Sequence, residues 1–162
     1  MSQLDRHILY AEDEETDAFL FQRAFRRAGI TDRLVVVPNG QAAMDHLTCA
    51  IEEAASGRHS LPLLVLLDVN MPAVSGFEVL QWIRATPAIA SLSIIMLSSS
   101  QLQADIHRAY LYGANGYLVK PTSVDECLSM AKTMKDWLTR ITPVGEPRNY
   151  LNPVVLPKAA FI

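Results

Sequence analysis

Polar side chains that could handle a metal ion or a phosphoryl group follow four apolar stretches of this chain. Asp68 comes directly after five consecutive apolar residues, and Glu12 and Asp13 follow another apolar run. Ser98 and Lys120 end two further runs in the same way. Short apolar runs of this kind predict buried strands. Because the carboxyl ends of parallel strands meet at one edge of a sheet, we expect these five side chains to converge there.

The residue types at this edge define a chemistry. Three carboxylates in one place repel one another, so one would take up a proton unless a cation lies between them. Oxygen ligands favour a hard divalent ion, and Mg²⁺ is the usual choice where phosphate is handled. Lys120 offers a positive charge and Ser98 a hydroxyl donor to a phosphoryl group. Asp68 would be the nucleophile, because carboxylates form phosphorylated intermediates.

The elements that must position these side chains alternate along the chain. Apolar runs predict strands at residues 7–11, 34–37, 63–67, 92–97 and 116–119. Helical periodicity predicts helices at about residues 16–28, 43–54, 76–86, 101–112 and 124–138. Five strands alternating with five helices predict an α/β protein with right-handed βαβ units and a doubly wound parallel five-stranded sheet in a single domain.

Composition excludes several other classes of protein. Half of the 162 residues are hydrophobic, which indicates a globular chain. A formal net charge of −3 gives no reason to expect nucleic-acid binding, and no apolar run approaches membrane-spanning length. The N-terminus is too polar for a signal peptide, and Cys49 and Cys127 are expected to be reduced core thiols. We therefore expect a cytoplasmic protein.

The motifs together resemble the receiver domain of two-component response regulators, in the CheY-like superfamily. The matching segments occur in the order of that family and are residues 8–13, 67–72, 75–76, 96–99 and 113–121. The resemblance implies a flavodoxin-like (βα)5 fold.

The resemblance also implies a domain organisation. We expect a receiver domain over residues 1–141, then a proline-containing apolar tail over 142–162, with no output domain. The long connection at about 50–62 and the tail are similar to the stand-alone regulators that pair with phytochrome-type kinases.

The resemblance assigns roles at the acidic site. It implies that Asp68 accepts a phosphoryl group from a sensor histidine kinase. It implies that Asp13, Asp68 and the backbone carbonyl of Asn70 bind Mg²⁺, with Glu12 acting through water. Many family members carry Asp where this chain has Glu12. The protein would not be an enzyme beyond catalysing its own phosphorylation and dephosphorylation.

The resemblance also implies a switch. Lys120 would contact the phosphoryl group, and Ser98 and Tyr117 would form the switch pair, with the Tyr117 ring filling space that the Ser98 hydroxyl vacates. The resemblance, and the need to aim Lys120 inward, predict a cis peptide bond between Lys120 and Pro121. Output would pass to an unknown downstream protein or through a change of oligomer.

A homodimer is expected through the fourth helix, the fifth strand and the fifth helix. Leu102, Ile106 and Tyr110 recur at four-residue spacing, which puts them on one face, and by the family alignment this face points outward. Met130 and Trp137 are left over beside the core stripe of the last helix and would extend the patch. The alternative is a shifted helical phase, in which Leu102 and Ile106 belong to the core.

Other functions fit the sequence less well. An aspartate-nucleophile phosphatase would need a second acid two residues after the nucleophile, where this chain has Asn70. A nucleotide or flavin binder would need a glycine-rich turn after the first strand, which is absent. A phosphorylation-independent receiver-like interaction module would not need the complete set of acids, hydroxyl and lysine.

Overall fold

The sheet is parallel and has five strands. The computed structural model describes residues 6–58 and 61–139. The strands are β1 (His7–Ala11), β2 (Arg33–Val37), β3 (Leu64–Asp68), β4 (Ser93–Ser98) and β5 (Gly116–Val119). They lie in the order β2-β1-β3-β4-β5, and every neighbouring pair is parallel. The predicted doubly wound sheet is confirmed, and the predicted strands agree with it to within one residue.

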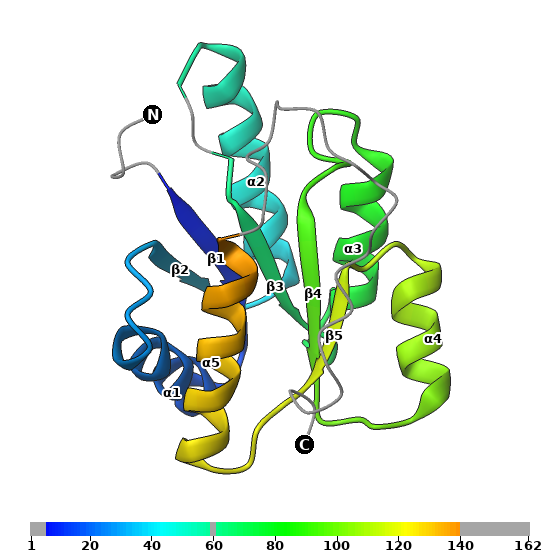
Figure 1. Ribbon diagram of the computed structural model, residues 1–162. Coiled ribbons are helices and arrows are strands. Elements are labelled where there is room, and N and C mark those ends of the chain that lie inside the picture. Colours follow the sequence, from blue (N-terminus) through cyan, green and yellow to red (C-terminus); the bar gives the residue numbers. More distant parts are fainter. Residues whose placement is uncertain (1–5, 59–60, 140–162) are drawn as a thin grey trace.

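Five helices cover both faces of the sheet. They are α1 (Glu15–Arg27), α2 (Gly40–Ala55), α3 (Gly76–Ala85), α4 (Gln103–Leu111) and α5 (Val124–Leu138). Figure 1 shows α1 and α5 together on one face, and α2, α3 and α4 on the other. This is the arrangement that right-handed βαβ crossovers produce, because successive helices change face where the strand order reverses.

The core divides into two layers, one on each face of the sheet. Along β1, Ile8 and Tyr10 point into the layer under α1 and α5, whereas Leu9 and Ala11 point into the layer under α2, α3 and α4. All four are 0% exposed. A strand buried on both faces reads as a continuous apolar run, which is why the sequence predicts these strands well.

Side-chain caps fix where several helices begin. The Ser75 hydroxyl accepts the Glu78 N–H, and the Glu78 carboxylate accepts the Ser75 N–H, which makes a capping box before α3. Asn39 caps α2, and Ser123 caps α5 as predicted. These caps hold the loops between strand ends and helix starts, where the polar side chains lie.

The prediction that Met130 and Trp137 lie on an exposed patch is wrong. They are 4% and 5% exposed and belong to the core layer under α1 and α5. Helix α5 packs against both the sheet and α1, so its buried stripe is wider than the one that a single partner would require. The indole N–H of Trp137 is buried without a hydrogen-bond partner among the described residues.

The predicted face of α4 is partly confirmed. Leu102 is 67% exposed and Tyr110 is 36% exposed, so these two side chains do face outward. Ile106 between them is only partly exposed and packs against the core. The alternative helical phase therefore holds for Ile106 but not for Leu102.

The two cysteines are free thiols, and Cys127 is buried. Cys49 is exposed and so is not the core thiol that was expected. Among the described residues, no helix combines the length and apolar character needed to cross a membrane. The predicted tail at 142–162 lies outside the described residues.

Two histidines meet at the amino end of β1, away from the strand ends that carry the acids. His7 Nε2 lies 3.1 Å from His46 Nε2, so one ring donates to the other. His7 is 2% exposed and His46 is half-buried. Burial lowers the pKa of His46, and the charge of Arg33 lowers it further, against a smaller opposing effect of Glu53. The folded protein therefore favours the neutral form of His46.

We expect this pair to make the fold sensitive to mild acid. In the unfolded chain His46 takes up its proton near the ordinary histidine pKa of about 6.5, whereas the folded chain resists protonation. Below that pH the unfolded state binds more protons at His46, so the contribution of His46 to the free energy of unfolding falls as the pH falls. This contribution is at most about 1.4 kcal/mol per pH unit. Urea unfolding at several pH values between about 5 and 7.5 measures the slope.

Two variants separate this effect from general acid denaturation. His46→Gln removes the titrating ring and should flatten the slope. His107→Gln, at an exposed histidine of α4, should keep the wild-type slope. A His46→Gln protein with the wild-type pH dependence would contradict the assignment.

Candidate functional site

The carboxyl ends of β1, β3, β4 and β5 bring the predicted polar residues together. Glu12 follows β1, Asp68 ends β3, Ser98 ends β4 and Lys120 follows β5. Glu12, Asp68 and Ser98 are 2%, 3% and 0% exposed. The convergence predicted from the strand pattern is confirmed for the side chains of Glu12, Asp68 and Lys120, which contact one another. Ser98 joins this edge through its backbone, because its carbonyl accepts the Lys120 N–H.

Lys120 lies at the centre of the group. Its Nζ atom is 2.8 Å from Glu12 Oε2, 3.1 Å from Asp68 Oδ2 and 3.1 Å from Asp17 Oδ2. An ammonium has three N–H donors, so three carboxylates match its full donor capacity. The lysine thus balances part of the negative charge that the strand ends bring together.

Asp17 was not foreseen from the sequence. It lies in the first turn of α1, whereas the polar residues predicted for the site all follow strands. A signal was nevertheless present, because Asp17 lies in the first turn of the helix that directly follows Glu12 and Asp13.

The charges shift the proton affinities of this group. Burial raises the pKa of Asp68 to about 7; Lys120 opposes this shift and Glu12 adds to it. For Lys120, burial alone would lower the pKa, but hydrogen bonds and charges from Glu12, Asp68 and Asp17 outweigh it and leave the pKa raised. The ammonium therefore stays charged, while the Asp68 carboxylate is crowded by its neighbours.

Tyr10 is a second residue that the sequence did not point to. Its hydroxyl donates to Glu12 Oε2 at 2.9 Å, and the Glu14 N–H donates to Glu12 Oε1 at 3.1 Å. Burial is the main cause of the raised pKa of Tyr10, and the Glu12 charge adds to it. With Lys120 included, Glu12 is held by three donors and its orientation is fixed.

Three acids form a cluster suited to a cation. Carboxylate oxygens of Glu12, Asp13 and Asp68 all lie within 4.8 Å of one another, and Asp13 is exposed. Oxygens around an octahedral ion at about 2.1 Å are about 3 to 4.2 Å apart, so small side-chain movements suffice to bind one. Asn70 lies exposed beside them, with its N–H 3.2 Å from Asp68 Oδ1. The donor set fits a hard divalent ion.

The predicted switch residues are linked through Ser100. The Ser98 hydroxyl oxygen accepts the Ser100 N–H at 3.0 Å, and the Tyr117 hydroxyl donates to the Ser100 carbonyl at 2.8 Å. Tyr117 is 1% exposed, so its ring already occupies an inward position. The Ser100 hydroxyl in turn donates to Asp105 on α4. The two residues are therefore connected by backbone groups rather than by direct packing alone.

The predicted cis bond before Pro121 is wrong. The described residues contain no cis peptide bond, so Lys120–Pro121 is trans. The prediction assumed that a cis bond was needed to aim the lysine inward. Its Nζ atom reaches Glu12 and Asp68 with a trans bond, because the long side chain spans the distance.

Gly76 allows the first turn of α3 to lie against the strand end. A Cβ atom at this position would be 2.2 Å from the Asp68 carbonyl oxygen. Its N–H donates to the Val69 carbonyl at 3.0 Å. Any side chain here would displace the backbone that carries Asp68. Steric crowding therefore explains why the Ser75-Gly76 motif has glycine at its second position.

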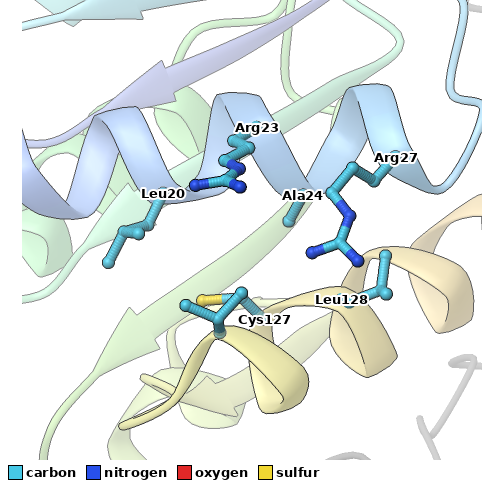
Figure 2. A pocket seen from close by; sticks show the side chains of 7 residues that line it. Leu20, Arg23, Ala24, Arg27, Cys127 and Leu128 are labelled. Carbon is cyan, nitrogen blue, oxygen red and sulfur yellow. The ribbon is translucent and has the colours of Figure 1, made fainter.

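The seam between α1 and α5 is not a ligand pocket. Figure 2 shows Arg23 and Arg27 of α1 above Cys127 and Leu128 of α5. The cavity between them measures about 10 Å³. That volume is at the lower limit for one water molecule, so small-molecule binding is not expected here.

The fold is that of a receiver domain of two-component systems. The family model described as "Response regulator receiver domain" matches residues 8–132. The chain therefore belongs to the response regulator receiver domain family, as the sequence motifs predict.

Two relatives match this chain over more than four fifths of its length. The regulatory protein FilR2 of Methanothrix harundinacea (strain 6Ac) is 37% identical over 132 residues, which cover 81% of this chain and 83% of FilR2. Response regulator Rcp1 of Synechocystis is 31% identical over 136 residues, which cover 83% of this chain and 90% of Rcp1.

Two solved structures of response regulators have a fold similar to that of this chain. The Mn²⁺-bound form of Rcp1 aligns with a TM-score of 0.70 at 31% identity, over 83% of this chain and 96% of that one. The phosphorylated cyanobacterial phytochrome response regulator RcpA aligns with a TM-score of 0.73 at 30% identity, over 85% of this chain and 96% of that one. The predicted similarity to regulators of phytochrome signalling is confirmed.

Proposed function

We propose that this protein is a response regulator that accepts a phosphoryl group on Asp68 from a sensor histidine kinase. One observation carries the proposal: Lys120 Nζ lies 3.1 Å from Oδ2 of a buried aspartate, beside the Glu12 and Asp13 carboxylates. A nucleophile, a fixed positive charge and an acidic cation-binding cluster at one edge are the parts that phosphoryl transfer needs.

The transfer that we propose forms one bond to phosphorus and breaks another. A carboxylate oxygen of Asp68 attacks the phosphorus of a phosphohistidine, and the P–N bond breaks with its electron pair on the imidazole nitrogen. Lys120 offsets the charge of the phosphoryl oxygens, and Ser98 turns its hydroxyl to donate to one of them. We propose one further reaction, hydrolysis of the acyl phosphate, in which water attacks the phosphorus and the Asp68 carboxylate leaves with the electron pair of the P–O bond.

We propose Mg²⁺ as the cation. Asp13, Asp68 and the Asn70 carbonyl would hold it directly, and Glu12 would act through water. When bound, the ion would neutralise charge on the phosphoryl oxygens. The relative Rcp1 has been solved in a Mn²⁺-bound form, and Mn²⁺ and Mg²⁺ share octahedral oxygen coordination.

The similarity to Rcp1 and RcpA favours a phytochrome-type kinase as the phosphoryl donor. We place this exchange in the cytoplasm, in agreement with the two free thiols. Nucleic acids and membranes are not proposed as partners. An aspartate-nucleophile phosphatase is less well supported, because the position two residues after Asp68 is Asn70, which cannot act as an acid or base.

Output would run from Ser98 to α4. A phosphoryl oxygen that draws the Ser98 hydroxyl inward removes the acceptor of the Ser100 N–H, and Ser100 contacts both Tyr117 and Asp105. The change would alter the outward face of α4, through which we propose a homodimer or contact with a downstream protein. Leu102 and Tyr110 are the exposed apolar groups of this face.

Phosphoryl uptake tests the acceptor. Incubation with acetyl phosphate and Mg²⁺ should add one phosphoryl group to the intact mass of the wild-type protein. Asp68→Asn should abolish this addition because the amide is not a nucleophile, and omission of Mg²⁺ should prevent it. Asp45→Asn, at an exposed aspartate of α2, should behave as wild type. Undiminished labelling of Asp68→Asn would refute the proposal.

Loss of the Ser98 hydroxyl tests the switch. Ser98→Ala should still take up the phosphoryl group, because Asp68 and Lys120 are unchanged. It should not change its affinity for itself or for a partner on phosphorylation, since the signal begins at the missing hydroxyl. The exposed neighbour Ser99→Ala is the matched control and should respond normally. A normal response of Ser98→Ala would move the coupling elsewhere.

A charge introduced at Leu102, the residue that precedes α4, tests the dimer. Leu102→Glu should weaken self-association at least tenfold, because a carboxylate would be buried in an apolar interface. Leu111→Glu is the control, because Leu111 is 71% exposed and lies at the other end of α4 from Leu102. Light scattering at micromolar concentration, with and without phosphorylation, measures both. A wild-type monomer in both states would exclude this surface.

A further inference from the structure

Asp17 is the carboxylate around Lys120 that the phosphoryl chemistry does not use. Glu12 and Asp68 belong to the cation cluster, whereas Asp17 does not. Its side chain is 38% exposed, compared with 0% for Glu12 and 4% for Asp68. It comes from α1, so it reaches Lys120 from a different element than the strand-end acids.

An incoming phosphoryl group would compete for the same lysine. Three carboxylates match the three N–H donors of Lys120, so contact with a phosphoryl oxygen requires one carboxylate to leave. Glu12 is anchored by Tyr10 and by the Glu14 N–H. Asp68 is the acceptor itself. Asp17 is therefore the carboxylate that can be released at the least cost, because water can solvate it.

We propose that Asp17 is a positioning residue that holds Lys120 in the unphosphorylated protein and is exchanged for the phosphoryl group. This inference rests on the proposed role of Asp68 as phosphoacceptor. The Lys120–Asp17 pair stabilises the resting state, so it opposes phosphorylation. Removing the carboxylate charge should therefore favour the phosphorylated form.

The expected gain is modest and measurable. Partly exposed ion pairs contribute little, so Asp17→Asn should bind beryllofluoride, a phosphoryl analogue, about two- to fivefold more tightly in the presence of Mg²⁺. Labelling by acetyl phosphate should accelerate by a similar factor. Glu15→Gln, at an exposed acid of the same helical turn, is the control for general electrostatics and should stay within about twofold of wild type.

A double-mutant cycle tests whether the effect runs through the lysine. In a Lys120→Gln background, Asp17→Asn should give no gain, because the group that it releases is absent. Binding of Mg²⁺ alone gives a readout separate from phosphorylation: Asp17→Asn should leave it within about twofold, since Asp17 lies outside the cation cluster. Asp17→Ala, which removes the hydrogen bond as well, should reproduce the gain.

The outcomes separate this inference from the proposed function. A wild-type protein that neither binds beryllofluoride nor takes up a phosphoryl group contradicts the acceptor role itself. If the wild type responds but Asp17→Asn binds equally or more weakly, Asp17 does not oppose phosphorylation and the inference is wrong. A gain that persists with Lys120→Gln would likewise overturn it.

Discussion

The pairing of one lysine with three carboxylates is the interaction on which the acidic edge depends. Two like charges about 4 Å apart in a site of intermediate dielectric repel by about 4 kcal/mol. Glu12 and Asp68 are both almost fully buried, so solvent offers little relief. Lys120 supplies the opposing charge within 3.1 Å of each acid. A cation in the adjacent cluster would complete the neutralisation, which explains why so much charge can remain unsatisfied by the protein alone.

The rest of the fold serves to deliver these groups to one place. Parallel strands bring β1, β3, β4 and β5 to a common edge, and the buried strands make that edge rigid. Gly76 lets α3 begin against the carbonyl of Asp68. Tyr10 is buried within β1, and its hydroxyl donates to Glu12 and fixes the orientation of that carboxylate. The site is thus built from rigid elements, which suits a geometry that must hold within fractions of an ångström.

Elements that leave a regular apolar pattern in the sequence were predicted correctly, whereas features that depend on contacts between elements were missed. Strands buried on both faces leave continuous apolar runs, so the sheet and the acids at its edge could be found directly. Asp17 was missed because it enters the site from a helix. Met130 and Trp137 were misassigned because α5 packs on α1 as well as on the sheet, which no periodicity within α5 reveals. A cis bond before Pro121 was wrongly predicted, because the sequence does not reveal that the Lys120 side chain reaches the acids with a trans bond.

The backbone hydrogen bond from Lys120 N–H to the Ser98 carbonyl, 2.8 Å long, has a consequence for the tempo of signalling. It ties the ends of β4 and β5 together, so the peptide of Ser98 is held and its hydroxyl moves by rotation about a single side-chain bond. Because Ser98 is 0% exposed and its hydroxyl oxygen accepts the Ser100 N–H, this rotation must release that hydrogen bond and is slower than the nanosecond turns of exposed side chains. Collective motions of packed elements take about microseconds to milliseconds, whereas enzymatic chemistry typically runs at about 1 to 1,000 events per second. In the proposed function, the response of the domain would therefore keep pace with the chemistry, and delay in the pathway would arise from phosphoryl transfer and from encounters between proteins.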